Sequence, residues 1–355
     1  MNQQAMRETA HAIVAYGKGL LAMDESIATC NQRFANANIA QTVEMRRGYR
    51  ELLLTAPGLS NYISGVILSD ESIRQTHSNG LTFVQVAHNA GLLVGIKVDT
   101  GTIEFTEHSV EKVTEGLDGL RQRLQSYFRF GARFAKWRSV IAVVDAQLPT
   151  LACIEANAHA LARYAVLCQE AGLVPVVEPE ILMEGDHSQA RCQEVTESVL
   201  CSVFCQLRQQ GVALEAMLLK PNMVISGLAC DRQNTATEVA DASLQCLLRV
   251  VPAVVPGILF LSGGQTGEMA SGRLHAMHGR HPVSLPSLAA GTPSGNPILP
   301  WTLSFSFARA LQYPALEIWA GKETNRNAAQ QALLQRAFCS SAAAKGEYSV
   351  MQESR

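Results

Sequence analysis

Eight short runs of apolar and β-branched residues recur along the chain, and this recurrence constrains the fold more than any other feature. The C-terminal ends of successive runs lie roughly 30 to 45 residues apart, which is about the length of one strand, one helix and their loops. The runs cover residues 20–23, 65–68, 92–98, 134–140, 174–177, 217–219, 258–261 and 303–307. The units share no sequence similarity, so the interval reflects repeated supersecondary structure rather than a sequence repeat.

Helical patterns fill the intervals between these runs. Residues 116–131 and 154–171 carry apolar side chains at steps of three and four, which places them on one face of a helix. Thr235 and Glu238 form a capping-box pattern directly in front of a helix that we expect over residues 239–251.

Strands that alternate with helices eight times predict an α/β fold, namely a parallel (β/α)8 or TIM barrel. A doubly wound open sheet is the alternative that the same pattern allows. The chain has 355 residues, a length that such barrels reach as one unit, and no linker composition divides it. We therefore expect a single domain over residues 1–355.

Two segments depart from this regular pattern. Residues 281–300 contain five prolines together with several glycines and serines, which predicts a long loop before the eighth run. Residues from about 340 to the end are small and polar, so we expect a mobile C-terminal tail there.

Composition narrows the classes of function. Hydrophobic residues make up 47% of the chain and the formal net charge is −2. The chain is therefore globular and has no general electrostatic attraction to nucleic acid or membranes. It contains no apolar run of about 18 residues, the length of a transmembrane helix, and its polar first residues lack a signal-peptide core. We expect no nucleic-acid partner, no membrane segment and a cytoplasmic location.

Cysteine and histidine spacing gives no support for a metal site. The nine cysteines are scattered without a CxxC pair, which argues against a zinc site and against a disulfide framework. The histidines show no HExxH motif and no other paired spacing for a metal. We therefore expect reduced thiols, no metal and no cofactor.

Polar residues follow each apolar run, and the active sites of parallel barrels lie at this end of the strands. Lysines lie in or directly after three of the runs, namely Lys97, Lys136 and Lys220. Carboxylates follow others, including Asp24 and Glu178. One pocket would therefore hold three lysines and several carboxylates, which predicts perturbed pKa values.

Lys220 is the most informative of these residues. The apolar residues 216–219 precede it and Pro221 follows it, and a lysine is almost never fully buried without a reason. An apolar site favours the neutral amine, a nucleophile that forms an imine with a ketone and so turns it into an electron sink. A single lysine of this kind would be more simply interpreted as a snorkelling surface residue. Three such lysines together with strand-end carboxylates favour a catalytic site.

Structural alternatives exist for the other candidates. Lys136 and Arg138 share one face of a strand, which could point into the barrel or away from it. Glu178 could belong to a simple turn, and Asp24 could be the N-cap of the next helix. The turn at residues 262–264 could bind a phosphate through backbone N–H groups or could be an ordinary tight turn.

The chain resembles the class I fructose-bisphosphate aldolases, the family that works through a Schiff base. The similar segments occur in the family's order and cover roughly residues 10–345. They are residues 17–26, 95–99, 116–120, 134–138, 162–165, 177–182, 218–223, 260–265 and 309–312. Four details differ from the usual pattern. Met23 and Ala308 stand where an alanine and a glycine are usual. The loop at residues 281–300 is longer than in the animal enzymes, and the end of the chain lacks their terminal tyrosine.

The resemblance implies a role for each polar candidate. Lys220 would form the imine at C2 of the substrate, and Lys136 would assist its formation by proton transfer and electrostatics. Glu178 would be the general acid and base, Asp24 would act on the C4 hydroxyl, and Glu180 would support the lysines.

The resemblance also implies how the two phosphates are bound. The 1-phosphate would be held by Ser262, Gly263 and Arg309. The other end of the sugar and its 6-phosphate would be held by Lys97, Arg138, Ser26, Thr29 and Arg33. A bisphosphate would explain why cationic residues gather locally in a chain of net charge −2.

The expected reaction is the reversible cleavage of fructose 1,6-bisphosphate to dihydroxyacetone phosphate and glyceraldehyde 3-phosphate, in a homotetramer without a cofactor. One alternative is a related Schiff-base aldolase that prefers sedoheptulose 1,7-bisphosphate or fructose 1-phosphate. Another is an aldolase-like binding protein without catalysis. Loss of Lys220 or Glu178 would favour the binding protein, and both residues are present.

Overall fold

The computed structural model describes residues 3–144, 147–278 and 299–354. Eight parallel strands close into a barrel in the order β1-β10-β9-β8-β7-β6-β3-β2. These strands are β1 (Gly19–Ala22), β2 (Ile63–Leu68), β3 (Leu93–Lys97), β6 (Phe134–Ile141), β7 (Val174–Ile181), β8 (Leu218–Leu219), β9 (Gly257–Phe260) and β10 (Thr302–Phe307). Each of the eight apolar runs forms one strand, so the predicted (β/α)8 barrel is confirmed.

The barrel is closed because β1 pairs with a strand on each side. Leu20 lies opposite Gly65 of β2 and opposite Ser306 of β10, and both pairings are parallel. An open doubly wound sheet would end in two edge strands instead. The open-sheet alternative is therefore wrong.

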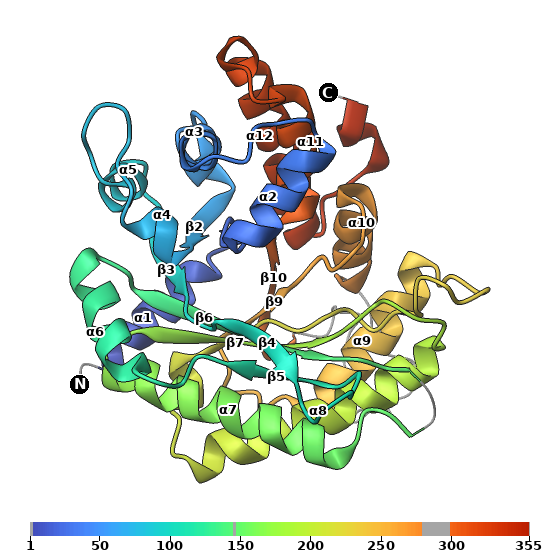
Figure 1. The fold of residues 1–355 in the computed structure, drawn as a ribbon. Helices are drawn as coiled ribbons and strands as arrows, with labels where there is room; N and C mark the ends of the chain where they lie inside the picture. The colour runs from blue at the N-terminus through green and yellow to red at the C-terminus, as the bar shows by residue number, and fades with distance from the viewer. Residues whose placement is uncertain (1–2, 145–146, 279–298, 355) are drawn as a thin grey trace, which may run out of the picture.

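Helices surround the barrel (Figure 1). They are α1 (Gln3–Ile13), α2 (Ile27–Asn36), α3 (Val43–Leu54), α4 (Asp70–Ile73), α5 (Phe83–Asn89), α6 (Leu120–Phe130), α7 (Leu151–Glu170), α8 (Gln189–Gln209), α9 (Ala236–Val250), α10 (Gly267–Met277), α11 (Arg309–Trp319) and α12 (Arg326–Ala344), with the short 3-10 helices η1 (Leu59–Asn61), η2 (Leu214–Ala216), η3 (Glu323–Asn325) and η4 (Val350–Ser354). The helices expected near 116–131, 154–171 and 239–251 are α6, α7 and α9.

The start of α9 has the predicted capping box. The Thr235 hydroxyl accepts a hydrogen bond from the Glu238 backbone N–H at 3.2 Å, and the Glu238 carboxylate accepts one from the Thr235 backbone N–H at 2.9 Å. These two bonds satisfy N–H groups that a helix leaves without intrahelical partners.

The inward faces of the strands form an apolar floor below a charged layer. Alternation along each strand points every second side chain into the barrel. Val174, Val176 and Leu218 pack inside the barrel in one cluster with residues of α1. The next inward positions on the same strands are Glu178 and Lys220. The strand register thus brings charged side chains to the C-terminal end of the barrel, while α1 packs on the floor.

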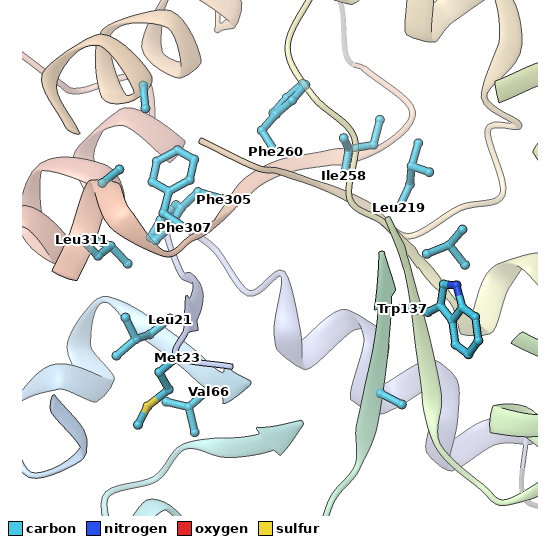
Figure 2. Packing of buried hydrophobic residues seen from close by; sticks show 14 of the residues in the cluster. Leu21, Met23, Val66, Trp137, Leu219, Ile258, Phe260, Phe305, Phe307 and Leu311 are labelled. Atoms are coloured by element: carbon cyan, nitrogen blue, oxygen red, sulfur yellow. The ribbon is translucent and has the colours of Figure 1, made fainter. Parts of the chain in front are cut away.

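The opposite strand faces pack against the helices. Trp137, Leu219 and Phe260 are fully buried in this outer core (Figure 2). Burying a large apolar side chain stabilises the fold by roughly 2 to 3 kcal/mol. Turning a strand over would remove these side chains from the outer core and lose this stabilisation, so the outer core fixes which residues face the interior.

A short antiparallel hairpin lies outside the barrel and was not expected from the sequence. It consists of β4 (Gly101–Glu104) and β5 (Lys112–Glu115), with Gly101 opposite Glu115. Each strand has four residues and a single large apolar side chain, Ile103 or Val113. The pattern is too short to give a strand signal.

The C-terminal segment differs from the expected mobile tail. Residues 340–344 complete α12, where Ser340 and Ala343 are fully buried. Beyond α12, Glu353 of η4 pairs with the buried Arg336 and accepts a hydrogen bond from the Tyr348 hydroxyl at 2.8 Å. The small residues that suggested mobility allow close helix packing instead, and the ion pair holds the segment after them.

The loop expected at 281–300 falls almost entirely outside the described residues. In the described part of the chain, no helix combines the length and the apolar character that crossing a membrane requires.

Candidate active site

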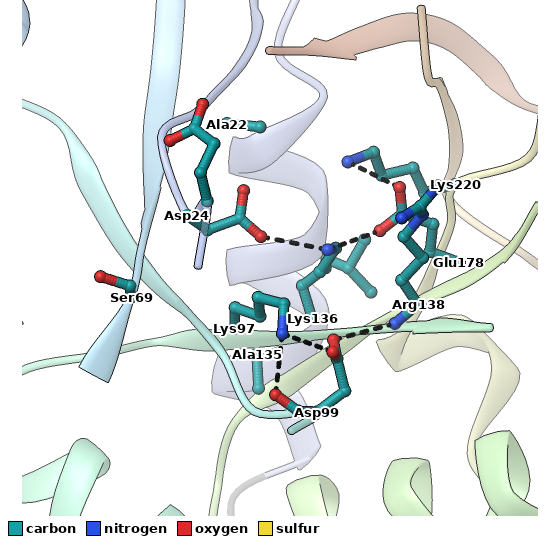
Figure 3. A network of polar contacts seen from close by, with 12 residues as sticks. Ala22, Asp24, Ser69, Lys97, Asp99, Ala135, Lys136, Arg138, Glu178 and Lys220 are labelled. Carbon is teal, nitrogen blue, oxygen red and sulfur yellow. Dashed lines mark hydrogen bonds and ion pairs between the residues drawn. The ribbon is translucent and has the colours of Figure 1, made fainter. Parts of the chain in front are cut away.

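The polar strand ends converge at the C-terminal end of the barrel, as the sequence predicted (Figure 3). Trp137 points into the outer core, so its neighbours Lys136 and Arg138 point into the barrel. This decides between the two orientations that the sequence left open. Arg138 of β6 lies opposite Glu178 of β7 in the parallel register, and Glu178 is therefore part of a strand rather than of a simple turn.

Glu178 lies between two lysines at the centre of the site (Figure 3). Its Oε1 is 3.0 Å from the Nζ of Lys220, and its Oε2 is 3.0 Å from the Nζ of Lys136. The side chains of all three residues are only 4–5% exposed. Charges at this depth need opposite charges in contact with them, and this arrangement provides them.

Asp24 extends this row of charges. Its Oδ2 accepts a hydrogen bond from the Nζ of Lys136 at 3.0 Å. Burial alone would raise the pKa of Asp24, but the ammonium groups of Lys136 and Lys220 outweigh burial and lower it to about 2. Asp24 is therefore ionised at neutral pH.

Burial and neighbouring charges also set the pKa values of Glu178 and Lys136, the neighbours of Asp24. Burial would raise the pKa of Glu178, but Lys136, Lys220 and Arg138 lower it below its ordinary value. Burial would lower the pKa of Lys136, but Asp24 and Glu178 raise it. At neutral pH the site contains two carboxylates that can accept protons and an ammonium between them.

A second group of charges lies beside the first. Lys97 pairs with Asp99, and Arg138 pairs with Glu180. Asp99 connects the two pairs, because its Oδ2 accepts a hydrogen bond from the Arg138 backbone N–H at 3.3 Å (Figure 3). Glu180 thus contacts an arginine, whereas the resemblance had implied that it supports the lysines.

The turn after β9 and the start of α11 meet at another side of the site. Arg309 donates a hydrogen bond from Nη2 to the Gly263 carbonyl oxygen at 2.7 Å. Gly263 follows Ser262 and has a φ of 54°, in the left-handed region that favours glycine. Turns of this kind can direct backbone N–H groups at an anion. Ala308 has a φ of −105°, so its position does not require the usual glycine for a left-handed backbone.

A bound anion would stabilise the charged guanidinium of Arg309. Burial lowers the pKa of its guanidinium, and Arg33 lowers it further. Two cations near each other on one side of a pocket are stabilised by a phosphate between or beside them.

The N-terminus of α2 contributes Ser26 and Thr29. The Ser26 hydroxyl accepts the Thr29 backbone N–H at 3.2 Å, and the two hydroxyl oxygens are 2.9 Å apart. Ser26 is the N-cap of α2, so the alternative that Asp24 is the N-cap is wrong. A helix N-terminus with exposed hydroxyls is suited to bind an anionic group.

Glu25 has a side chain that is only 5% exposed in this region, and the sequence did not single it out. It pairs with Arg33, and its Oε2 lies 2.7 Å from the Nη2 of Arg50. Its Oε1 also accepts a hydrogen bond from the Nε2 of Gln312 at 2.8 Å. Glu25 lies between the candidates Asp24 and Ser26, and this position was the one sign in the sequence that it could belong to the site. Its partners on α3 and α11 could not be inferred from sequence spacing.

A cavity of about 550 Å³ opens beside Asp24 and Lys97, which is within the range of small-molecule sites. Within the described residues, no group of three or more His, Cys, Asp or Glu side chains could hold a metal ion.

A (β/α)8 barrel with a buried lysine in contact with a carboxylate at its C-terminal face has the chemistry of a lyase that works through a lysine imine. Comparison with known proteins narrows this class. A sequence model of the family "Fructose-bisphosphate aldolase class-I" matches residues 5–355.

Curated relatives agree with this match. The "Probable fructose-bisphosphate aldolase class 1" of Xanthomonas campestris is 50% identical over 349 residues, which cover 98% of this chain and 99% of the relative. "Fructose-bisphosphate aldolase B" of Gallus gallus is 45% identical over 347 residues, which cover 98% of this chain and 91% of the relative.

A solved structure agrees as well. It is the fructose-bisphosphate aldolase of Plasmodium falciparum in complex with TRAP and a small-molecule inhibitor, with a TM-score of 0.90 and 42% identity over 98% of this chain and 96% of that one. The chain belongs to the class I fructose-bisphosphate aldolase family. Its reaction is the reversible aldol cleavage of fructose 1,6-bisphosphate to dihydroxyacetone phosphate and glyceraldehyde 3-phosphate.

Proposed function

We propose that Lys220 is the nucleophile that forms the Schiff base in this reaction. The contact of 3.0 Å between the Nζ of Lys220 and the Oε1 of Glu178 is the observation that supports this role most strongly. Lys220 first gives a proton to Glu178, and the neutral amine then adds to the C2 carbonyl of the open-chain sugar. One proton moves from the nitrogen to the C2 oxygen to give a carbinolamine. Glu178 then returns its proton to the C2 hydroxyl, which leaves as water, and a protonated imine remains on Lys220.

Lys136 assists this step as a charged neighbour. Its raised pKa keeps it an ammonium at neutral pH. A hydrogen-bond donor at this position stabilises the negative charge that develops on the C2 oxygen during attack. It also holds Asp24 and Glu178 in their orientations through its two contacts of 3.0 Å.

Asp24 acts in cleavage of the C3–C4 bond. The ionised carboxylate accepts a hydrogen bond or the proton from the C4 hydroxyl, a step in which Glu178 shares, and the C4 oxygen becomes the aldehyde of glyceraldehyde 3-phosphate. The electron pair of the broken bond passes into the imine and gives an enamine on Lys220. Protonation at C3 and hydrolysis of the imine release dihydroxyacetone phosphate and regenerate the amine.

The cationic groups of the site bind the two phosphates. The 1-phosphate lies against Ser262, Gly263 and Arg309, where a left-handed turn and an arginine offer donors. The other end of the sugar and the 6-phosphate are bound by the remaining candidates, Lys97, Arg138, Ser26, Thr29 and Arg33. Glu180 orients Arg138, and no metal or cofactor takes part.

We also propose that the enzyme works as a homotetramer in the cytoplasm. The resemblance implies the tetramer, and the free cysteines in the described part of the chain suit a reducing compartment. A light-scattering mass of about four chains of 38.4 kDa each would support the assembly. A stable mass of one chain at enzyme-assay concentration would contradict it.

Cleavage assays with coupled triose detection test the proposed chemistry. Fructose 1,6-bisphosphate, sedoheptulose 1,7-bisphosphate and fructose 1-phosphate are compared, each with and without excess chelator. We expect the highest kcat/KM for fructose 1,6-bisphosphate and no effect of chelator, because the imine already supplies the electron sink. Absence of triose with every substrate would favour the binding protein. Activity that is lost in chelator and restored by zinc would contradict the imine mechanism.

A further inference from the structure

Met183 joins the strand of the acid–base residues to the turn proposed for the 1-phosphate. It follows β7, which carries Glu178 and Glu180, and its side chain is buried with 5% exposed. Its sulfur reaches the turn at residues 262–265, which follows β9. The Gly264 backbone N–H donates a hydrogen bond to the Sδ of Met183, with nitrogen and sulfur 3.0 Å apart.

Met183 is itself held firmly on the opposite side. Its carbonyl oxygen accepts a hydrogen bond from the Leu228 backbone N–H at 2.8 Å. Its sulfur also packs so closely on Gly263 that a Cβ atom at that position would collide with it. The thioether therefore contacts both glycines of the turn from a fixed base.

The turn is anchored at each of its peptide groups. Arg309 donates to the Gly263 carbonyl oxygen at 2.7 Å, and the Gln265 backbone N–H donates to the Ser262 carbonyl oxygen at 3.0 Å. The sulfur of Met183 adds the anchor for the Gly264 N–H. With this N–H group fixed, the left-handed Gly263 keeps one orientation, and the Ser262 hydroxyl and the Gly263 N–H are held in a constant direction.

We propose that Met183 is a positioning residue for the 1-phosphate. Its thioether fixes the Ser262–Gly263 turn through Gly264, so that the turn is ordered before the phosphate arrives. Pre-ordering a loop lowers the free-energy cost of binding. A thioether is a weak acceptor, so it suits an anchor that need not compete with the phosphate itself. This inference rests on the proposed 1-phosphate site.

The condensation direction tests the inference, because each triose phosphate carries one of the two phosphates. Dihydroxyacetone phosphate supplies the 1-phosphate and glyceraldehyde 3-phosphate supplies the 6-phosphate. Met183→Leu keeps most of the side-chain volume and removes the acceptor. We expect the KM for dihydroxyacetone phosphate to rise by about threefold to tenfold, the effect of one lost hydrogen bond. The KM for glyceraldehyde 3-phosphate and kcat should stay within about twofold of the wild-type values.

Met6→Leu is the matched control, because Met6 is a buried methionine in α1 at the floor of the barrel. It should leave both KM values unchanged. Hydrogen exchange followed by mass spectrometry gives a readout that does not depend on activity. The peptide that contains residues 262–265 should exchange faster in Met183→Leu than in the wild type or in Met6→Leu.

The outcomes separate this inference from the proposed site. An unchanged KM for dihydroxyacetone phosphate in Met183→Leu would overturn the positioning role, and so would an equal rise of both KM values. Arg309→Ala tests the site itself. If Arg309→Ala left the KM for dihydroxyacetone phosphate unchanged, the 1-phosphate assignment would fail first. If only Arg309→Ala raised it, the assignment would stand without the role of Met183.

Discussion

The Nζ of Lys220 lies 3.0 Å from the Oε1 of Glu178, on the neighbouring strand of the barrel wall. The second oxygen of Glu178 is the same distance from Lys136. One carboxylate therefore contacts both the proposed nucleophile, Lys220, and Lys136, whose pKa is raised. A proton released at Lys220 has an acceptor in contact, and the site keeps its charges balanced while the imine forms.

Replacing Glu178 by Gln should damage both catalysis and stability. We expect kcat to fall by about a hundredfold to ten-thousandfold, the usual loss when a positioned acid or base is removed. The free energy of unfolding should fall by about 3 kcal/mol, because Lys136 and Lys220 lose a buried counter-charge. Steady-state cleavage and urea denaturation measure these effects.

Glu170→Gln is the control for this substitution, because Glu170 makes an exposed ion pair with Arg121 on the surface. It should leave kcat unchanged. A Glu178→Gln enzyme with near wild-type kcat would show that another group moves the proton.

Asp24→Asn should change how stability depends on pH. The folded pKa of Asp24 is about 2, below the ordinary value of 3.8. The stability that this carboxylate contributes is present above the ordinary value and is lost as the pH falls through the folded value. Its size at neutral pH is about 2 kcal/mol.

Urea denaturation of Asp24→Asn and the wild type at pH 6 and pH 3 measures the stability that the ionised Asp24 contributes. The difference in their free energies of unfolding should shrink by about 1 kcal/mol at the lower pH. The same comparison with Asp231→Asn, at an exposed aspartate, provides the control. A difference for Asp24→Asn that stays constant over this range would show that Asp24 is not held ionised by the lysines.

Deleting residues 349–355 should affect stability more than catalysis. The segment is mostly polar and contains no tyrosine. Its acidic side chain, Glu353, is occupied by Arg336 and Tyr348, so we expect the segment to move no proton in the site. We expect the cleavage rate to change by less than about tenfold, or roughly 1.4 kcal/mol in the barrier. The free energy of unfolding should fall by about 2 kcal/mol, because the buried Arg336 loses its ion pair with Glu353.

Glu353→Gln separates the ion pair from the rest of the segment and should reproduce most of the loss of stability. Proton exchange on dihydroxyacetone phosphate should be as insensitive to the deletion as cleavage is. A much larger drop in either rate, with the fold intact by circular dichroism, would mean that the segment takes part in catalysis.

The barrel could be predicted from the sequence because its strands are the most apolar segments of the chain. The wall residues are buried on both faces, so runs such as 174–177 and 258–261 contain few polar interruptions. Glu178 and Lys220 could be placed for the same reason, because each follows directly after an apolar run. Even β8, which consists only of Leu218 and Leu219, could be predicted from its apolar run.

The remaining features depend on contacts between distant segments. The Glu25 side chain is buried against Arg33, Arg50 and Gln312. Local sequence spacing does not reveal its contacts with Arg50 of α3 and Gln312 of α11. The C-terminal residues appeared free because small and polar side chains are common in tails, yet Arg336 gives Glu353 a buried partner. Glu180 lies opposite Val140 in the strand register but pairs diagonally with Arg138, a contact that the sequence spacing likewise does not reveal.

The most direct test of the central claim is chemical trapping of the imine. Borohydride added together with dihydroxyacetone phosphate reduces an imine to a stable amine, so the ligand stays covalently bound to the lysine that formed it. Peptide mapping by mass spectrometry should find the adduct on Lys220, and Lys220→Ala should abolish labelling. An adduct on Lys136 or Lys97 in the wild-type enzyme would contradict the assignment of the nucleophile.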